Sequence, residues 1–517
     1  MTESCCEIRG GDFDQAGAAS RLLKEQLKKI GVAPEILRRA VIAAYEAEMN
    51  VVIHAHRGVM KTALDDTQAR VEVLDEGPGI ADPELAMTEG YSTAGRRARQ
   101  LGFGAGLGLP NIRKSVDRFT IESTVGQGTR LRFTIYLKPQ AGGPDKPNSL
   151  QIKAEGCTQC LRCIRVCPTR AMRVRGTRPQ KLDYLCVDCM SCIAACPAGA
   201  LTVEPTVGQF VAAPECVLVL QPAVVAQYVP AWSVEDLQEG LRQLGFSKVI
   251  VTERAESDLR AAVLEHAQAE GGGPTLSSVC PAVLNLIETR FPSLLRSVAP
   301  YLSPLEAVRE ELSGRRATFV VLCLAQKTLL GMGRGPEEVD AVLPAQMESK
   351  LRPLLKSSRD AAAAVEAAAG EDPRIARITG MAEVVRVLEE IENGDMTEPR
   401  VVELYACDEG CFGSPLLRED PRVSRRYYRT STAAPLAARA IRRRVALEGR
   451  PGLRLDSTMA GAIQKLAEIN RLLQDLPGED CGLCGSPTCA ALAEDIVLGR
   501  ASADACRKAS GGTDETR

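Results

Sequence analysis

The sequence lacks a strong charge of either sign, a long apolar run and, almost entirely, histidine. Its 64 basic and 66 acidic residues leave a formal net charge of −2, so bulk electrostatics favours neither nucleic acid nor an anionic membrane. No apolar stretch approaches the roughly 18 residues that a membrane helix needs. The only histidines are His54, His56 and His266. None lies on a recognisable dimerisation helix, so we do not expect a phosphoryl group to be accepted by histidine.

The first residues, MTESCCEIRGGDFD, lack the basic region and the apolar stretch of a secretory signal. We therefore expect a cytoplasmic protein, where thiols stay reduced and disulfides are rare. What the chain has in abundance is cysteine, with 19 residues. In a reducing compartment so many thiols indicate metal binding rather than cross-links. If the metal is held as many iron–sulfur clusters, we expect an anaerobic or microaerobic host.

The patterns along the 517 residues predict three or four domains and a multidomain fold of α+β and α/β type. Residues 1–137 alternate helical and strand patterns, and 138–150 form a linker rich in proline and glycine. Residues 151–204 form a compact unit with an internal repeat. Residues 212–455 alternate strand-like runs with helical stretches, which predicts an α/β domain. Residues 456–510 hold a predicted helix and a last group of cysteines.

Residues 151–204 contain two copies of the spacing Cys-x2-Cys-x2-Cys-x3-Cys-Pro. The first copy is Cys157, Cys160, Cys163 and Cys167, and the second is Cys186, Cys189, Cys192 and Cys196. This pattern resembles bacterial ferredoxins with two [4Fe–4S] clusters, which implies low-potential electron transfer. The resemblance also implies that the fourth cysteine of each copy serves the other cluster, so that Cys196 joins the first set and Cys167 the second. The alternative is a structural zinc knuckle.

Four short segments within residues 1–137 predict a nucleotide site. Glu46 and Asn50 lie four apart on a predicted helix and so share a face. The other segments are DEGPG at the end of a strand, GFGAGLGLPN at the start of a helix, and GQGT before the last strand. Their candidate residues are Asp75, Gly77, Gly79, Gly104, Gly106, Gly108 and Thr129. Glycines let backbone N–H groups reach phosphate oxygens, and a following helix start adds positive potential.

In this order the four segments resemble the GHKL ATP-binding domain shared by DNA gyrase, histidine kinases and anti-sigma-factor kinases. The short domain and its YSTAG lid are most similar to the anti-sigma type. The resemblance implies that Asn50 binds Mg²⁺, that Asp75 and Thr129 meet the adenine, and that the second glycine loop cradles phosphate. Glu46 would be the catalytic residue, a general base toward a hydroxyl or a water. The alternative is a nucleotide fold without turnover.

Three separated segments of residues 212–455 carry cysteine at the ends of predicted elements, namely Cys280, Cys323, Cys407 and Cys411. They resemble the loops around the active-site cluster of [FeFe]-hydrogenases, which implies a [4Fe–4S] cluster on these four thiols and a two-iron subcluster, if present, on Cys411. Hydrogen-producing members place cysteine and lysine where this chain has Val279 and Gln326. We therefore expect a hydrogenase-like domain of sensory or accessory type that keeps its cluster without H₂ turnover. A scaffold with buried cysteines and no cluster is the alternative.

The last group of cysteines is Cys481, Cys484, Cys489 and Cys506. It resembles the small helical [4Fe–4S] domain of corrinoid-linked and electron-transfer proteins, with zinc as the alternative metal. Three cysteines remain. Cys216 opens an apolar run and is expected in the core, whereas Cys5 and Cys6 are expected in a mobile tail without a role.

Together these patterns predict an iron–sulfur protein of electron transfer or redox sensing, with up to four [4Fe–4S] clusters and one site for ATP with Mg²⁺. Its expected partners are a ferredoxin or hydrogenase subunits, and a protein substrate if the ATP domain is a kinase. No nucleic-acid or membrane partner is expected. The alternatives are a redox-regulated serine/threonine protein kinase, an [FeFe]-hydrogenase that turns over H₂, and a protein whose ATP hydrolysis drives electrons to lower potential.

Overall fold

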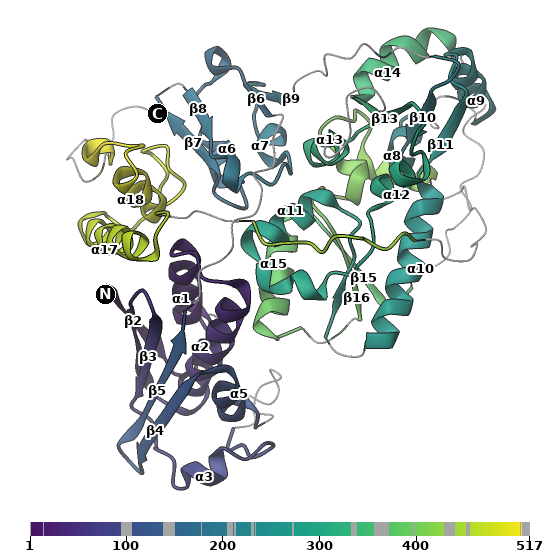
Figure 1. Cartoon of the computed structure of the whole chain (residues 1–517). Helices are drawn as coiled ribbons and strands as arrows, with labels where there is room; N and C mark the ends of the chain where they lie inside the picture. The colour runs from purple at the N-terminus through teal and green to yellow at the C-terminus, as the bar shows by residue number, and fades with distance from the viewer. Residues whose placement is uncertain are drawn as a thin grey trace. The chain divides into compact units, whose positions relative to one another are not determined.

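The chain forms two compact units in a computed structural model (Figure 1). The first comprises Met1–Gly143, Arg450–Cys484 and Thr488–Arg517, and the second Pro144–Gly449 and Gly485–Pro487. Residues near the C-terminus thus group with the N-terminal domain. The structure describes residues 2–13, 15–94, 106–137, 150–176, 178–203, 210, 213–228, 232, 234–270, 273–331, 339–355, 372–396, 398, 400–428, 440–450, 455–506 and 508.

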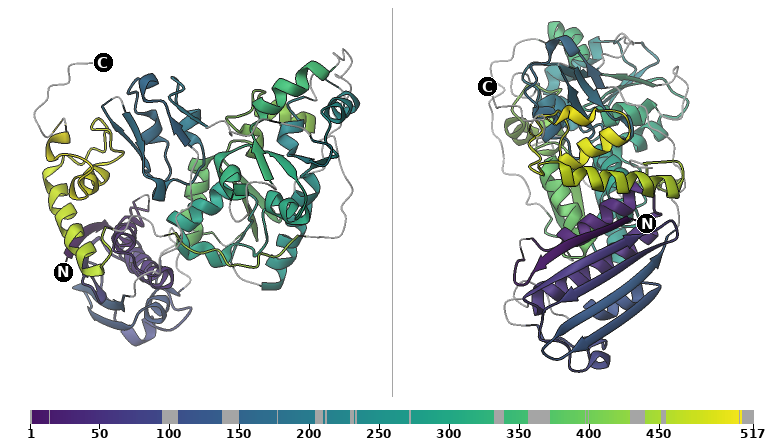
Figure 2. Two further views of the ribbon diagram at one scale, coloured as in Figure 1. Left: turned by 45° about the horizontal axis from the view of Figure 1, so that its top comes forward. Right: turned by 90° about the vertical axis from the view of Figure 1, so that its left-hand side faces the viewer.

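The first unit contains a five-stranded antiparallel sheet in the order β1-β2-β3-β5-β4. Its strands are β1 (Thr2–Arg9), β2 (Arg57–Leu64), β3 (Gln68–Asp75), β4 (Arg118–Thr124) and β5 (Gly128–Tyr136). Alternate residues of β2, β3 and β5 are buried, because successive side chains of a strand point to opposite faces. Helices cover the buried face, as the right-hand view of Figure 2 shows. They are α1 (Ala18–Lys29), α2 (Pro34–His54) and α5 (Gly108–Ser115), with the short α3 (Pro83–Ala86) after β3.

Helix α2 confirms the predicted apolar stripe. Pro34 stands in its first turn, where its missing N–H is not needed. The side chains of the stripe are buried, namely Leu37, Val41, Ala44, Tyr45 and Val52. The predicted hairpin also forms, with Thr124 opposite Gly128 across the turn between β4 and β5.

The expected tail around Cys5 and Cys6 is wrong, because these residues lie in strand β1. The strand pairs with β2 from Thr2 opposite Leu64 to Arg9 opposite Arg57. Thr2 and Ile8 are buried while Cys5 faces solvent, so the segment has the period of two that a half-buried strand needs. Its polar composition hid that period.

Two C-terminal helices complete the first unit. These are α17 (Met459–Asp475), as predicted for 461–474, and α18 (Cys489–Val497), followed by the 3₁₀ turn η6 (Ala503–Ala505). Threonine caps the start of both helices: Thr458 accepts from the N–H of Gly461, and Thr488 from that of Ala491.

The ferredoxin-like part of the second unit shows the predicted repeat. Each half has a 3₁₀ turn before its first cysteine and a short helix after its second. The elements are β6 (Leu150–Ile152), η1 (Ala154–Gly156), α6 (Arg162–Arg165), β7 (Met172–Arg175), β8 (Arg178–Lys181), η2 (Asp183–Leu185), α7 (Ser191–Ala194) and β9 (Leu201–Val203). Strands β6 and β9 pair, as do β7 and β8, and both pairs are antiparallel.

The remainder of the second unit is built on two parallel sheets. The four-stranded sheet has the order β11-β10-β13-β14 and the three-stranded sheet the order β12-β16-β15. The strands are β10 (Val217–Leu220), β11 (Lys248–Val251), β12 (Thr275–Leu276), β13 (Ala317–Val320), β14 (Val339–Val342), β15 (Ile375–Thr379) and β16 (Val401–Tyr405). All residues of β10, β13 and β16 are buried, as in parallel sheets covered on both faces. Cys216, before β10, is buried as expected.

Helices flank these sheets (Figure 1). They are α8 (Pro222–Val225), α9 (Val234–Gln243), α10 (Glu253–Glu270), α11 (Pro281–Arg290), α12 (Pro304–Glu311), α13 (Leu324–Gly331), α14 (Pro344–Leu351), α15 (Met381–Asn393) and α16 (Pro421–Tyr428), with 3₁₀ turns η3 (Pro292–Ser297), η4 (Arg352–Leu354) and η5 (Gly410–Gly413). Among the described residues, no helix combines the length and apolar character of a membrane span.

Candidate nucleotide and iron–sulfur sites

Glu46 and Asn50 on α2 meet the start of α5, where the second glycine loop ends. A Cβ atom at Gly108 would lie 3.2 Å from Oε2 of Glu46 and 3.3 Å from Oδ1 of Asn50. Nδ2 of Asn111 donates a hydrogen bond to Oε1 of Glu46 at 2.7 Å. The sequence motif contains Asn111 but does not reveal this role, because nothing in the spacing shows which side chain faces Glu46.

The Asn50 side chain has a polar atom that the described residues leave unpaired. Its Nδ2 atom is buried and has no hydrogen-bond partner in the described part of the chain. Leaving such a group unpaired costs about 1–3 kcal/mol. Because an amide also offers an oxygen, which Mg²⁺ accepts as a ligand, the residues present fit a magnesium-bound nucleotide.

Asp75, at the end of β3, organises the other side of this site. Its Oδ1 atom accepts hydrogen bonds from the N–H groups of Gly77 at 2.9 Å and Thr129 at 3.2 Å. Burial raises the pKa of Asp75, and these hydrogen bonds oppose the shift. A Cβ at Gly128, whose φ is +89°, would lie 2.0 Å from the backbone oxygen of Asp75. The structure therefore brings together Asp75, Gly77 and Thr129, as the sequence predicts.

Ser123 is a second residue that the sequence pattern does not reveal. Its Oγ atom lies 2.9 Å from Oγ1 of Thr129 and accepts from the N–H of Ile80 at 2.7 Å. The hydroxyl therefore ties β4 to the segment after Asp75. Serine in an alternating strand has no distinguishing signal in the sequence.

The glycine loops contact other backbone closely. A Cβ at Gly79 would lie 2.2 Å from the carbonyl oxygen of Thr124, and one at Gly106 would lie 2.5 Å from the carbonyl carbon of Gly90. The N–H of Gly90 donates to the carbonyl of Gly106 at 3.0 Å, which joins the loop to the segment before the lid. Gly104 lies outside the described residues.

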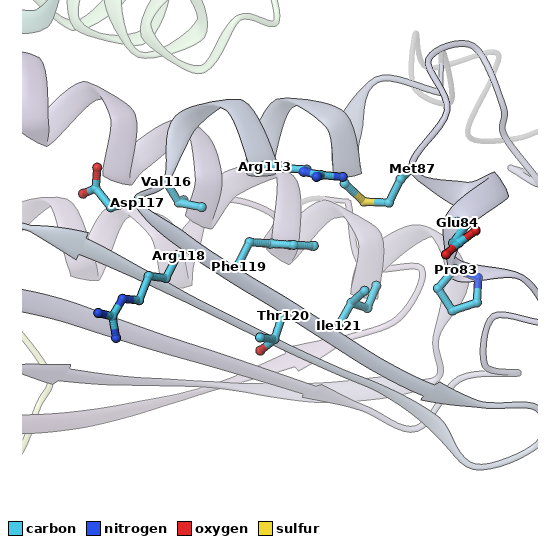
Figure 3. Close-up of a pocket in the computed structure, with 10 residues that line it drawn as sticks. All are labelled: Pro83, Glu84, Met87, Arg113, Val116, Asp117, Arg118, Phe119, Thr120 and Ile121. Atoms are coloured by element: carbon cyan, nitrogen blue, oxygen red, sulfur yellow. The ribbon is translucent and has the colours of Figure 1, made fainter.

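A separate open pocket of about 680 Å³ lies between α3, the end of α5 and the edge strand β4 (Figure 3). Half-buried Phe119 and Ile121 face it, together with Met87 and Arg113. None of the residues drawn there belongs to the predicted nucleotide set.

The ferredoxin-like cysteines gather in the two interleaved sets that the repeat predicts. Burial and the neighbouring thiols of Cys157, Cys160 and Cys196 raise the pKa of Cys163 to about 11. In the second set, burial and then Cys189, Cys167 and Cys186 are the foremost causes that raise the pKa of Cys192.

Both sets occupy loops of equivalent backbone shape. Gln159 and Leu161 have φ of 56° and 59°, and Asp188 and Met190 have φ of 58° and 62°. Left-handed backbone at such residues costs about 1–3 kcal/mol each and persists only where the surroundings impose it. The N–H of Ala171 donates to Sγ of Cys167 at 3.2 Å, the kind of contact that tunes cluster potential. This soft donor set with backbone donors to sulfur fits [4Fe–4S] clusters.

The hydrogenase-like cysteines follow the carboxyl ends of parallel strands. Cys280 lies between β12 and α11, Cys323 precedes α13, and Cys407 and Cys411 follow β16. Burial, then Cys280 and Cys323, raise the pKa of Cys411 well above its ordinary value. Burial, then Cys411 and Cys280, do the same to Cys407. The structure therefore brings these four predicted residues together.

The positions that depart from hydrogen-producing hydrogenases line a small cavity beside Cys411. Its volume is about 40 Å³, and Val279, Gln221 and Gln326 are among its lining residues. The two glutamine side chains are hydrogen-bonded to each other, because each Nε2 donates to the other's Oε1, at 3.0 and 2.8 Å. Oε1 of Gln326 also accepts from the N–H of Leu322 at 2.7 Å. These three side chains carry no ionisable proton, but Glu256, whose pKa burial raises to about 7, also lines the cavity.

The ferredoxin-like and hydrogenase-like parts are in direct contact within the second unit. Oγ1 of Thr328 donates to Oδ2 of Asp188 at 3.0 Å, and Nη1 of Arg290 donates to the carbonyl of Pro168 at 2.9 Å. After burial and two thiols of its own set, Cys189 is the next group that raises the pKa of Cys407. The second ferredoxin set and the hydrogenase-like set are therefore neighbours.

Three of the terminal cysteines, Cys481, Cys484 and Cys489, lie at the start of α18 or in the loop before it. Cys489 is the first residue of α18, and its N–H donates to Oδ1 of Asp480 at 2.6 Å. Gly482 and Gly485 have φ of 75° and 78°, so the loop with Cys481 and Cys484 turns tightly. Cys506 is buried after η6. Within the described ranges, no three His, Cys, Asp or Glu side chains converge as a site for a single metal ion.

Family models match four segments of the chain. "Histidine kinase-like ATPase domain" matches residues 11–135, and "4Fe-4S dicluster domain" matches 149–197. "Iron only hydrogenase large subunit, C-terminal domain" matches residues 210–343, and "Putative Fe-S cluster" matches 476–507. These matches confirm the predicted order of domain types.

Curated relatives each match less than a quarter of the chain. Serine/threonine-protein kinase RsbT of Bacillus subtilis is 28% identical over 125 residues, which cover 23% of this chain and 88% of that protein. An anti-sigma F factor of Caldanaerobacter subterraneus subsp. tengcongensis is 34% identical over 100 residues, which cover 18% of this chain and 66% of the factor. The chain thus spans slightly less than two thirds of the factor's length.

Solved structures with similar parts include the [FeFe]-hydrogenase HydA1 from Chlamydomonas reinhardtii, at 15% identity and a TM-score of 0.31, over 44% of this chain and 86% of that chain. The mycobacterial sensor histidine kinase MprB has 18% identity and a TM-score of 0.16, over 20% and 73%. These scores are low, so the assignment rests on the family models. The chain combines a histidine kinase-like (GHKL) ATPase domain, a dicluster [4Fe–4S] ferredoxin domain, an iron-only hydrogenase-like domain and a C-terminal Fe–S domain.

Proposed function

We propose that this chain is a redox-sensing accessory protein of hydrogenase or ferredoxin metabolism, in which electrons pass among up to four [4Fe–4S] clusters and the ATP-binding domain responds. The sixteen cysteines predicted as ligands would hold the clusters, which supply one-electron storage and transfer when bound. The observation that carries the proposal is the direct contact of the ferredoxin-like and hydrogenase-like parts, where Cys189 lies close enough to Cys407 to raise its pKa. It would give electrons a route from the second ferredoxin set to a hydrogenase-like site that has Val279 in place of the relay cysteine.

The side chains around Cys411 support sensing rather than H₂ production. Val279 cannot hold a proton, and Gln326 is engaged with Gln221. Neither position therefore offers the proton-relay group that the resemblance expects there, whereas the cysteines predicted to hold a cluster are all present. An [FeFe]-hydrogenase that turns over H₂ remains the alternative that this arrangement disfavours.

The test is anaerobic counting of iron and sulfide with EPR, with and without MgATP. Loaded protein should contain about 16 iron atoms, since each of four clusters holds four. Cys189→Ser should lose the signal of one ferredoxin cluster and slow reduction of the hydrogenase-like cluster. Cys216→Ser changes a buried cysteine outside every predicted set and should do neither. Steady H₂ evolution from the reduced, fully matured protein would contradict the sensing role.

A second candidate function is that of a redox-regulated serine/threonine protein kinase. The hydrogen bond from Asn111 to Glu46 favours it, because it orients a carboxylate that can act as a base. Similarity to a kinase named RsbT supports it too. In this reaction Glu46 accepts the hydroxyl proton of a partner's serine or threonine while that oxygen bonds to the γ-phosphorus, and the bond to the ADP oxygen breaks.

The kinase reaction is tested through Glu46→Gln, which removes the base but keeps the shape. With MgATP and the purified, loaded protein, ADP formation should fall by about 10²-fold or more. Glu35→Gln changes a residue in the first turn of the same helix, far from the site, and should leave the rate unchanged. If Glu46→Gln leaves all phosphoryl transfer intact, the kinase role fails.

A further inference from the structure

Helix α17 contributes side chains to the core of the ATP-binding domain. Its inward face is fully buried, and these residues belong to the same apolar core as α1, α2 and the five-stranded sheet. The residues that extend this core are Leu455, Ala462, Ile463, Leu466, Ile469 and, on α18, Ala493. A shared core is close-packed, so a displacement on one side is felt on the other.

Polar contacts join the same elements. Nζ of Lys29, at the end of α1, pairs with Oε1 of Glu494 on α18 at 2.5 Å, and their side chains are only 16% and 12% exposed. Nδ2 of Asn470 donates to Oγ1 of Thr2 at 3.3 Å, and the N–H of Leu455 donates to the carbonyl of Lys29 at 3.3 Å. An ion pair this far from water constrains both helices more than an exposed pair would.

Helix α1 is tied in turn to the helix that bears the nucleotide residues. The carboxylate of Glu48 on α2 is 2% exposed and accepts from the N–H groups of Ala19 at 3.1 Å and Ser20 at 2.9 Å. No side chain at Gly17 caps α1, so Glu48 supplies the cap from another helix. Glu48 lies two residues from both Glu46 and Asn50, and a shift of α1 therefore acts on α2 beside the ATP site.

On the other side, the predicted ligand Cys489 begins α18, four residues before Ala493 and five before Glu494. The first turn of α18 is therefore fixed to the cysteine loop, and its second turn is fixed to the ATP-binding domain. The ferredoxin-like and hydrogenase-like cysteines belong to the other compact unit, as does the segment Gly485–Pro487 between Cys484 and Cys489, whereas all four terminal cysteines belong to the first.

We propose that the C-terminal Fe–S domain is the regulatory element of the ATP site within this chain, and that the state of its cluster sets nucleotide affinity through α18, α17, α1 and Glu48. This inference rests on the proposed function only in that the terminal cysteines hold a cluster. Of the four predicted clusters, the terminal one would control the ATP site, because α17 and α18 pack directly on the ATP-binding domain.

The test measures the dissociation constant of a non-hydrolysable ATP analogue with Mg²⁺ by anaerobic calorimetry on the full chain. Cys506→Ser removes one predicted terminal ligand, and the constant should change by about 5-fold or more, a usual size for coupling between sites. Cys157→Ser makes the same substitution in the ferredoxin domain and should leave the constant within about twofold. An equal change in both variants, or none in Cys506→Ser, would overturn the inference.

A second variant keeps every cysteine. Glu494→Gln breaks the ion pair to Lys29, and the affinity difference between oxidised and dithionite-reduced protein should shrink while the iron content stays constant. Glu468→Gln, on the exposed face of α17, should keep the full difference. Equal redox responses of these two variants would reject the packing route even if Cys506→Ser fails to fold.

Iron and sulfide counts separate the two levels of failure. If Cys506→Ser contains as much iron and sulfide as the unchanged chain, the terminal cluster assumed by the proposed function is absent. If it loses a cluster but binds the analogue with unchanged affinity, the proposed function stands and the regulatory assignment falls.

Discussion

At the scale of single residues, the nucleotide site depends on positions where a side chain has no room. Gly108 brings the backbone against Glu46 and Asn50, and Gly128 brings it against Asp75. Asn111 donates a hydrogen bond to Glu46 on α2. The N–H groups at the start of α1 donate to Glu48 on the same helix α2. These contacts explain why the glycine loops are needed beyond their ability to face phosphate.

Gly108→Ala should weaken ATP binding with little effect on folding. The added methyl group would press on Glu46 and Asn50, which must each move by a few tenths of an ångström. We expect a loss of affinity of about 10-fold, equivalent to about 1.4 kcal/mol. Calorimetric titration with MgATP measures it.

The control for this substitution is Gly126→Ala, at the turn between β4 and β5. Its φ of +77° makes alanine strained, but open space surrounds the site. It should lower stability without changing affinity. Equal affinities of Gly108→Ala and the unchanged chain would show that the loop does not approach the ligand in this way.

At the scale of elements, buried ion pairs hold segments that the hydrophobic pattern alone would not place. Arg443 reaches α12 and makes two hydrogen bonds of 2.9 Å to Glu306. Burial raises the pKa of Glu306, but the hydrogen bonds from Arg443 and Ser303 outweigh it, so the pKa lies below its ordinary value. This pair therefore holds the segment around Arg443 against α12 in the second unit.

Arg443→Met should destabilise the second unit by about 3–5 kcal/mol, because it leaves a buried carboxylate without its partner. Arg444→Met removes a neighbouring arginine that is 86% exposed and should cost about 0–1 kcal/mol. Thermal unfolding of both variants checks the difference. Similar losses of stability would show that pairing with the buried carboxylate of Glu306 stabilises the fold no more than the exposed pair of Arg444 does.

The Arg443–Glu306 pair also predicts how the stability of the second unit depends on pH. Stability should fall as the pH is lowered, the opposite of what a carboxyl group with a raised pKa would give. Because the folded-state pKa of Glu306 is below its unfolded value, its contribution is complete above the unfolded pKa and is lost as pH falls through the folded pKa. In Arg443→Met the added acid sensitivity should therefore disappear. Melting temperatures across this acidic range measure it.

At the scale of the whole molecule, the order of domains along the chain differs from their grouping in space. The C-terminal Fe–S domain shares a core with the N-terminal ATP-binding domain, and the two cysteine-rich domains between them form the other unit, together with the segment Gly485–Pro487. The chain therefore joins the predicted nucleotide site and a predicted cluster site within one compact unit, which makes the coupling between them a local question of packing.

Removal of residues 455–517 should destabilise the ATP-binding domain. Each buried leucine or isoleucine of α17 contributes about 1.5–3 kcal/mol when removed from water. Hydrogen–deuterium exchange should then show lost protection in β1 and α1. A chain ending at residue 508 keeps the whole described module and should protect both elements. If β1 and α1 stay protected in the chain that lacks residues 455–517, the core of the ATP-binding domain is complete without α17.

Short-range spacing in the sequence was enough to predict many residues of the candidate nucleotide site and of the ferredoxin-like cysteine sets. The ferredoxin repeat, the glycine loops and the stripe on α2 are short-range patterns, and the structure brings their described residues together. Cys163 lies near Cys157, Cys160 and Cys196, the set that the resemblance to two-cluster ferredoxins implies. The ligand roles of all these residues stay predictions.

What the sequence by itself determined is therefore the set of domain types and many of the candidate residues that the fold brings together, because helix period, glycine freedom and cysteine spacing act within a few neighbouring residues. Only the tertiary structure decided that Thr2–Arg9 is a strand, that Glu48 caps α1 and that α17 completes the first core. These features depend on groups tens to hundreds of residues apart. Burial against a distant partner leaves no period of its own in the chain.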